Sequence, residues 1–177
     1  LTLIKNVTND NGGKALPSAW TLVATGPTGF SGSGPSVSNG AGFEPGSYDL
    51  SESGGPAGYS ASAWVCEGGT QIDSDTVALA LGESATCTII NDDAAPSLTL
   101  IKAVTNNNGG ETLPSAWTLS ATGPTSFSGS GVGVSSGANF KAGSYVLSES
   151  GGADTDGYSA SDWGCDSVTP DEPGPII

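Results

Sequence analysis

The chain has 177 residues and a mass of 17.3 kDa, and its 18 acidic side chains against four lysines give a formal net charge of −14. Such a surface repels phosphate backbones, which proteins bind through clustered Lys and Arg, so we expect no nucleic-acid partner. Because the sequence has neither His nor Arg, imidazole-based catalytic triads, His-ligated zinc sites and arginine clamps on phosphate are excluded. No apolar run approaches the roughly 18 residues that a membrane span needs.

An internal repeat divides the chain. Residues 1–55 align with residues 98–152 at an offset of 97, and 42 of the 55 positions are identical. A period of this length is too long for a solenoid unit and matches one complete all-β domain. We therefore expect two domains, residues 1–93 and 98–177, joined by a short linker at 94–97 in which Pro96 restricts hinge motion.

Within the first repeat, bursts of β-branched and aromatic residues alternate with clusters of Gly, Pro, Asn and Ser, which is typical of strands and turns. The expected strands are 1–8, 19–25, 29–32, 36–43, 46–53, 59–67 and 76–91, the last divided by a turn at Gly82-Glu83 into a hairpin. No segment shows a helical period. This spacing predicts an all-β fold with one β-sandwich in each repeat.

The second repeat is incomplete. Its Trp163-Gly164-Cys165 matches Trp64-Val65-Cys66, but only 12 residues follow Cys165, so the closing hairpin has no counterpart. An open sandwich exposes sheet edges. We expect either that the chain continues beyond residue 177 or that another molecule supplies the missing strands by β-augmentation. The proline-rich tail at 170–175 cannot form a central strand, because Pro removes ladder donors.

One lysine, one glutamate and one asparagine fall on the inward face of predicted strands. Strand alternation places Lys5, Glu52 and Asn91 on the same faces as their apolar neighbours two residues away. Burial penalises charged forms, so an apolar pocket favours Lys5 as a neutral amine and Glu52 as a neutral acid. Lys5 could then attack the Asn91 carboxamide while Glu52 moves protons, which yields an isopeptide bond and ammonia. The alternative is a buried Lys5–Glu52 ion pair that Asn91 caps by hydrogen bonding.

Two of the three cysteines lie in the first repeat. A Cys66–Cys87 disulfide would close a loop of 22 residues, which stabilises the fold by roughly 3 kcal/mol and indicates an oxidising, extracellular compartment. The alternative is two buried free thiols. Cys165 aligns with Cys66, so its natural partner belongs to the missing hairpin, with an intermolecular bridge as the other option.

Three segments together resemble a known family. They are the lysine of the first strand, Gly-Ser-Tyr-Asp-Leu-Ser-Glu-Ser at 46–53 followed by Gly-Tyr at 58–59, and Thr-Ile-Ile-Asn at 88–91. They resemble the B-type, prealbumin-like (SpaA-like) domains of bacterial collagen adhesins and pilins, over the whole first repeat and as much of the second as is present. The resemblance implies tandem Ig-like or prealbumin-like β-sandwich domains in a stalk or pilus.

Many domains of that family crosslink themselves through Lys, Asn or Asp, and Glu. By position these roles map onto Lys5 and Asn91 as the crosslinked pair and Glu52 as the promoting acid. The second repeat offers Lys102 and Glu149 in the same roles but lacks the asparagine.

Two weaker signals remain. The loop at 9–13 (Asn-Asp-Asn-Gly-Gly), with Asp10, Asp92 and Asp93 as carboxylates, has the composition of a calcium loop, but a plain turn explains it as well. We expect no cofactor, with calcium as the one candidate. The four tryptophans are expected in the cores rather than on a sugar-binding platform; they are Trp20, Trp64, Trp117 and Trp163.

The sequence therefore predicts an extracellular structural module of a bacterial cell-surface stalk, adhesin or pilus-like filament. We expect no enzyme activity beyond a single-turnover, autocatalytic crosslink. The expected partners are like subunits or neighbouring repeats of the same surface protein, with a host or glycan ligand in addition. The alternatives are a glycan- or matrix-binding module of a secreted or surface protein, and a filament subunit completed by a strand from a neighbouring chain.

Overall fold

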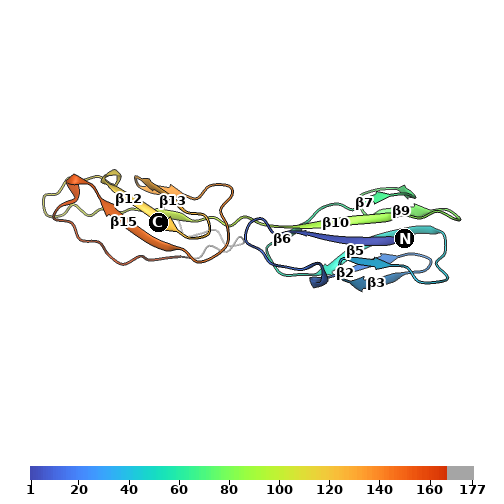
Figure 1. The fold of residues 1–177 in the computed structure, drawn as a ribbon. Helices are drawn as coiled ribbons and strands as arrows, with labels where there is room; N and C mark the ends of the chain where they lie inside the picture. Colours follow the sequence, from blue (N-terminus) through green and yellow to red (C-terminus); the bar gives the residue numbers. More distant parts are fainter. Residues whose placement is uncertain (167–177) are drawn as a thin grey trace. The chain divides into compact units, whose positions relative to one another are not determined.

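The computed structural model describes residues 1–166. They divide into two compact units, the first formed by Leu1–Ser97 with Ala138–Gly143 and the second by Leu98–Gly137 with the residues from Ser144 onward. Strands dominate both units, as predicted (Figure 1). The described helices are three single 3-10 turns, η1 (Pro17–Ala19), η2 (Pro114–Ala116) and η3 (Ala153–Thr155). In this described part of the chain, no helix has the length and apolar character that crossing a bilayer requires.

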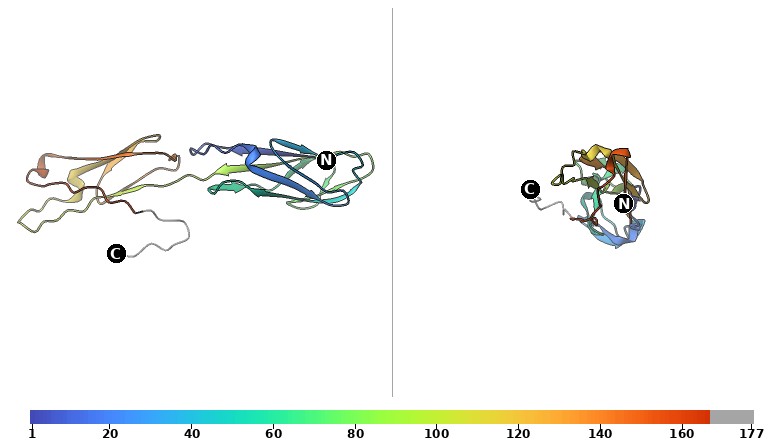
Figure 2. Two further views of the ribbon diagram at one scale, coloured as in Figure 1. Left: turned by 90° about the horizontal axis from the view of Figure 1, so that it is seen from below. Right: turned by 90° about the vertical axis from the view of Figure 1, so that its left-hand side faces the viewer.

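Two five-stranded sheets form the first repeat. The first sheet contains, in order, β4 (Ser36–Ser38), β1 (Thr2–Thr8), β10 (Thr86–Asp93) and β6 (Tyr59–Ala61), with β7 (Val65–Glu67) also paired to β10. The second sheet contains, in order, β3 (Phe30–Ser33), β2 (Trp20–Thr25), β5 (Gly46–Gly54), β9 (Thr76–Leu79) and β8 (Thr70–Gln71). The longer strands run lengthwise through the repeat, and the turns gather at its two ends (Figures 1 and 2).

The first and last strands of this repeat lie side by side and run parallel (Figure 1). Their register pairs Leu3 with Cys87 and Val7 with Asn91. Because a strand sends alternate side chains to opposite faces, β1 buries Leu1, Leu3 and Lys5 and leaves Asn6 exposed. This pairing brings the two ends of the repeat into one sheet.

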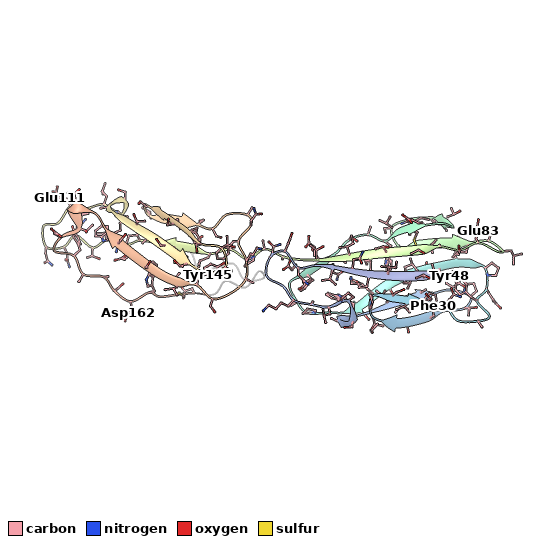
Figure 3. The ribbon with its side chains drawn as sticks, in the orientation of Figure 1. Phe30, Tyr48, Glu83, Glu111, Tyr145 and Asp162 are labelled. Atoms are coloured by element: carbon pink, nitrogen blue, oxygen red, sulfur yellow. A yellow bond between two sulfur atoms is a disulfide. The ribbon has the colours of Figure 1, made fainter. Side chains whose placement is uncertain are left out.

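The core of the first repeat lies between the two sheets. It consists of inward-facing apolar residues from both, chiefly Leu3, Leu22, Ala24, Tyr48, Leu50, Trp64, Val77, Leu79, Cys87 and Ile89. Phe30 and Tyr48 lie at one end of the core (Figure 3). The Phe43 ring stacks on Tyr48, with ring centroids 4.6 Å apart, and Phe30 packs edge-on against Phe43. The buried Tyr48 hydroxyl donates to the Glu44 carbonyl at 2.6 Å, so the ring is buried without an unsatisfied polar group.

The predicted disulfide is confirmed. Cys66 on β7 and Cys87 on β10 are register partners, and their sulfur atoms are bonded. The disulfide therefore ties β7, at the edge of the sheet, to the strand that pairs with β1. Among the described residues, Cys165 is the one free cysteine, and it is exposed.

Several predicted strand boundaries differ from the structure. The strand expected at 36–43 ends at Ser38, and the one expected at 59–67 breaks at residues 62–64 into β6 and β7. The short β8 was not predicted at all. The strand is interrupted at residues 62–64, where the Trp64 side chain turns into the core, and alternation alone does not mark such a break.

The predicted hairpin at Gly82-Glu83 is wrong. β9 pairs with β5 and β8, whereas β10 pairs with β1, β6 and β7, so the turn carries the chain from one sheet to the other. Glu83 in this turn accepts a hydrogen bond from the Ala80 backbone N–H at 2.9 Å (Figure 3). A hairpin and a sheet-to-sheet turn share the same turn residues, so the sequence pattern did not separate them.

The described part of the second repeat, residues 98–166, has fewer strands than the first repeat. One sheet contains β13 (Phe127–Ser130), β12 (Trp117–Thr122) and β15 (Val146–Gly151), and the other contains β11 (Thr99–Ile101) and β14 (Gly133–Ser135). Between residues 98 and 166, no strand corresponds to β9 or β10. β15 starts three residues later than its counterpart β5, because the first residues of β5 form their ladder with β9. Tyr145 is consequently half-buried, whereas its counterpart Tyr48 is fully buried.

Reduction of the Cys66–Cys87 disulfide should lower the free energy of unfolding of the first repeat by about 3 kcal/mol, because the unfolded chain then regains the entropy of an open loop of about 20 residues. Calorimetry with and without reductant measures the shift. The double variant Cys66→Ser/Cys87→Ser should melt like the reduced protein, and Cys165→Ser should melt like the oxidised one. Equal melting of the oxidised and reduced proteins would contradict the prediction.

Candidate crosslinking site

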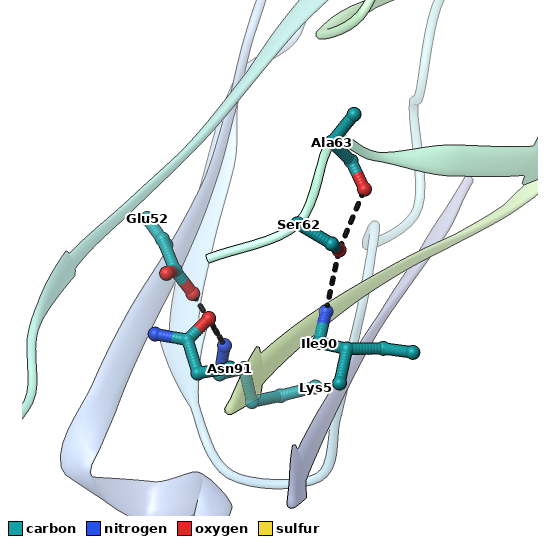
Figure 4. A network of polar contacts seen from close by, with 6 residues as sticks. All are labelled: Lys5, Glu52, Ser62, Ala63, Ile90 and Asn91. Carbon is teal, nitrogen blue, oxygen red and sulfur yellow. Dashed lines mark hydrogen bonds and ion pairs between the residues drawn. The ribbon is translucent and has the colours of Figure 1, made fainter. Parts of the chain in front are cut away.

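Three strands from both sheets bring Lys5, Glu52 and Asn91 together at one point of the first repeat. Lys5 on β1 donates from Nζ to Glu52 Oε2 at 2.6 Å and also to Asn91 Oδ1 (Figure 4). Asn91 belongs to β10, the strand next to β1, and Glu52 belongs to β5 in the opposite sheet. The structure thus joins the three residues that strand alternation placed on inward faces. Their roles in a crosslink stay a prediction.

The site is almost closed to solvent. Lys5 is 1% exposed and Asn91 3%, while the Glu52 side chain keeps 13% of its surface. Burial lowers the pKa of Lys5 below its ordinary value, although the hydrogen bond and the charge of Glu52 act in the opposite direction. Lys5 therefore loses its proton to become a neutral amine more readily than a lysine in water does.

Trp20 forms one wall of the site, a role that we did not predict for it. The Lys5 Nζ lies 4.7 Å from the centre of a Trp20 ring, within the range of a cation–π interaction. Trp20 in turn packs edge-on against Tyr59, at 5.4 Å between ring centroids. The sequence marked Trp20 as a core residue, and it gave no sign that its ring faces the lysine.

A glycine just after Glu52 allows this tryptophan to cover the site. Gly55 has a φ of +81°, and a Cβ atom built there would lie 2.2 Å from Trp20 Nε1. Only glycine tolerates both the backbone conformation and the contact. The second repeat keeps the glycine in sequence, as Gly152, but there its φ is −85° and a Cβ atom would not contact Trp117.

Ser62 holds β10 in place beside the site, and the sequence analysis did not predict this role. Its backbone N–H donates to the Ile90 carbonyl at 2.8 Å, and its hydroxyl accepts from the Ile90 N–H at 3.1 Å (Figure 4). Ser62 thus continues the pairing of β10 across the gap between β6 and β7. Its partner Ile90 is the residue just before Asn91. In a chain so rich in serine, nothing in the local pattern distinguishes this one.

The second repeat contains the lysine and the glutamate of this arrangement but not the asparagine among its described residues. Lys102 Nζ lies 2.7 Å from Glu149 Oε2 and 4.6 Å from the centre of a Trp117 ring. The Lys102 and Glu149 side chains are 14% and 20% exposed, more than their counterparts in the first repeat. Within residues 98–166 no asparagine side chain hydrogen-bonds to Lys102, so the third member of the site is missing from the described residues.

The carboxylates of the calcium candidate lie close together. Ligand oxygens of Asp10, Asp92 and Asp93 are all within 4.8 Å of one another. Asp93, however, already accepts backbone N–H groups from Asp10 and Asn11 at 2.9 and 3.0 Å and from Gly13 at 2.5 Å. These hydrogen bonds explain the shape of the loop as a turn anchored on Asp93, and calcium stays the alternative.

The tryptophans fall mostly where we expected them. Trp20, Trp64 and Trp117 are buried, which confirms the core placement, but Trp163 is 38% exposed. Its counterpart Trp64 packs in a core that contains β9 and β10, and the second repeat lacks both among its described residues. A single exposed tryptophan does not form an aromatic platform.

The chain matches a known protein family. The family described as the prealbumin-like fold domain, of SpaA type, matches twice, over residues 1–89 and 92–173. The two matches cover nearly the whole chain, which therefore belongs to this family, as the sequence motifs predicted. Searches of curated proteins and of solved structures give no significant match. The two repeats are thus tandem prealbumin-like domains, a type that points to structural modules of surface and pilin proteins.

Acid should destabilise the first repeat through Asp93. Burial by itself raises the pKa of Asp93, but hydrogen bonds from the backbone N–H groups of Asn11, Gly13 and Asp10 hold it below its ordinary value. Between the two pKa values the unfolded chain binds more protons than the folded one. The stabilisation is therefore complete above about pH 4 and is lost as the pH falls through the folded-state value.

Thermal melting of the Asp93→Asn variant from pH 2 to pH 7 tests this. The variant should be less stable than the parent at neutral pH, and the difference should shrink below pH 4. Asp92→Asn, which changes an exposed neighbour, is the matched control and should follow the parent. A constant difference at every pH would show that the Asp93 charge does not contribute.

Proposed function

We propose that this chain is an extracellular structural module of a bacterial surface stalk, adhesin or pilus-like filament, and that its first repeat closes itself with a Lys5–Asn91 isopeptide bond. The observation that carries the proposal is the buried Lys5 amine, which is hydrogen-bonded to a carboxylate and to a carboxamide at once. Membership of the prealbumin-like family and the disulfide, which forms in oxidising compartments, support the surface location.

The chemistry needs only these three side chains. Lys5 passes a proton to Glu52, and the neutral Nζ, which donates to Asn91 Oδ1 before the reaction, then adds to the neighbouring Cγ atom of Asn91. Glu52 then delivers its proton to the departing amide nitrogen and accepts the second proton from Nζ, so that Nζ ends as a secondary amide. The Nζ–Cγ bond forms, the Cγ–Nδ2 bond breaks, and ammonia leaves. Each chain reacts once and no cofactor takes part, so the process is self-modification and not turnover of an external substrate.

The site's burial favours this reaction over a simple ion pair. Desolvation lowers the pKa of the amine, and both partners are already positioned, so little reorganisation precedes attack. The sandwich holds the first and last strands in register on either side of the future bond. With three of four tryptophans buried, the structure gives less support to the glycan-binding alternative.

The crosslink should make the chain about 17 Da lighter than its sequence mass, because one ammonia is lost in acyl transfer. Intact mass spectrometry under reducing conditions measures the difference. Glu52→Ala should restore the full mass, since the proton carrier is gone. Asn91→Ala should do the same, since no leaving group remains.

Glu149→Ala provides the matched control for this experiment. It removes the equivalent acid from the second repeat, where no asparagine among the described residues lies at the lysine, and the 17 Da deficit should persist. A parent protein of full sequence mass would leave the Lys5–Glu52 pair as a buried ion pair and refute the crosslink.

The crosslink should also make the first repeat inextensible under tension. Lys5 and Asn91 are 86 residues apart, which corresponds to about 290 Å of extended chain at about 3.4 Å per residue. Force spectroscopy on a chain held at both ends should show no such lengthening for the parent and a lengthening of this order for Glu52→Ala under reducing conditions. Identical extension of both proteins would contradict a bond at this position.

A further inference from the structure

We propose that the second repeat is an acceptor for an extended peptide strand, which binds along β11 as β10 lies along β1 in the first repeat. The occupant is a strand with the chemistry of residues 84–93, with small or apolar side chains on one face and an asparagine toward the end of that face. Strand binding is independent of the function proposed above. The covalent step that follows it rests on that function.

The free edge of β11 carries the first argument. On one side β11 pairs with β14, and the Lys102 N–H donates to the Val132 carbonyl at 2.9 Å. The equivalent strand β1 uses its other side to pair with β10, beginning with the Thr2 N–H, which donates to the Ala85 carbonyl at 2.9 Å. By the same alternation the Ile101 N–H of β11 faces the edge where, among the described residues, no strand lies.

A cavity beside this edge carries the second argument. It measures about 700 Å³, and its lining includes Lys102, Val104, Trp117, Glu149 and Tyr158. In the first repeat the matching lysine and glutamate meet Asn91 from β10 and are more deeply buried. The cavity therefore opens on the reactive pair, at the place where a strand would bring its asparagine.

Trp163 and Cys165 supply a third argument. Their counterparts are Trp64, which is buried in the core, and Cys66, which is bonded to Cys87 of β10. In the second repeat both residues are exposed, and the cysteine is free. The edge, the cavity and Cys165 all lack contacts that β10 provides in the first repeat, and Trp163 lacks the core to which β10 contributes.

The occupant is not β10 of a second copy. That strand already pairs with β1, β6 and β7, its Cys87 is bonded and its Asn91 is buried. Releasing it would unfold the first repeat. The strand must therefore come from a segment that is free to extend, and its inward face must match Cys87, Ile89 and Asn91, three of the four residues that β10 buries.

Once the strand is bound, Lys102 could close the site covalently. Its Nζ would add to the Cγ atom of the strand's asparagine, Glu149 would carry the proton to the departing nitrogen, and ammonia would leave. The product would be the protein plus the peptide less about 17 Da. Lys102 already sits 2.7 Å from Glu149, so the strand has only to supply the carboxamide.

A fluorescent peptide with the sequence of residues 83–93 tests the acceptor, with serine at the Cys87 position so that no disulfide can form. Its fluorescence anisotropy should rise saturably with the full chain. The rise should be lost when the peptide carries proline at the Ile89 position, which removes a ladder donor. It should also be lost with the protein variant Ile101→Pro, which removes the N–H at the open edge and leaves the bond from Lys102 to Val132 in place.

Circular dichroism and the melting curve of Ile101→Pro establish that this variant remains folded. Intact mass spectrometry then detects whether the bound peptide becomes covalently attached. An adduct should form with the parent and with Lys14→Arg, but not with Lys102→Arg or with a peptide in which alanine replaces the asparagine.

If the anisotropy does not rise saturably, the second repeat is not a strand acceptor. If binding survives Ile101→Pro, the peptide binds at another site and the proposed edge is refuted. Binding without an adduct overturns the covalent step alone. The mass deficit of the isolated protein is measured separately, so a failure of the Lys5–Asn91 crosslink is distinguishable from a failure of strand binding.

Discussion

The burial of the Lys5 ammonium group between two sheets is the constraint on which the first repeat depends. Removing such a group from water costs several kcal/mol unless partners replace the solvent. The sandwich supplies a carboxylate from β5, a carboxamide from β10 and an aromatic face from β2. These groups come from different strands of both sheets, so the lysine is satisfied only when the whole sandwich has formed. A buried lysine would weaken an ordinary apolar core. Here it favours one arrangement of the strands, because only that arrangement supplies all of its partners.

The two repeats show which part of the site is local. In the second repeat the lysine, the glutamate and the tryptophan keep nearly the same distances as in the first, although the described residues include no equivalent of β10. Pairing of β12 with β15 and of β11 with β14 is therefore enough to position these three groups. The last strand adds the carboxamide and excludes water. The chemistry is preorganised by the early strands and completed by the final one.

Strand alternation was sufficient to predict the inward faces of β1, β5 and β10, because a period of two fixes the side of every residue once one apolar side chain is placed. It was not sufficient to predict partners. The turn at Gly82-Glu83 reads as a hairpin until the pairing of β9 with β5 is known. Ser62 and Trp20 act through contacts with residues far away in sequence, and their own neighbourhoods carry no mark of this. The family resemblance identified the fold but gave no information about these contacts.

The parallel pairing of β1 with β10 also sets an order of events during synthesis. β1 leaves the ribosome first, and its central partner in the sheet is the last strand of the repeat to emerge. Contacts between such distant segments are slow to form, because a long loop must close first. Until residues 86–93 are available, β1 has only the short β4 beside it and Lys5 has no carboxamide. The sheet that contains β1 is therefore completed, and Lys5 gains its carboxamide partner, only when the final strand of the repeat is available.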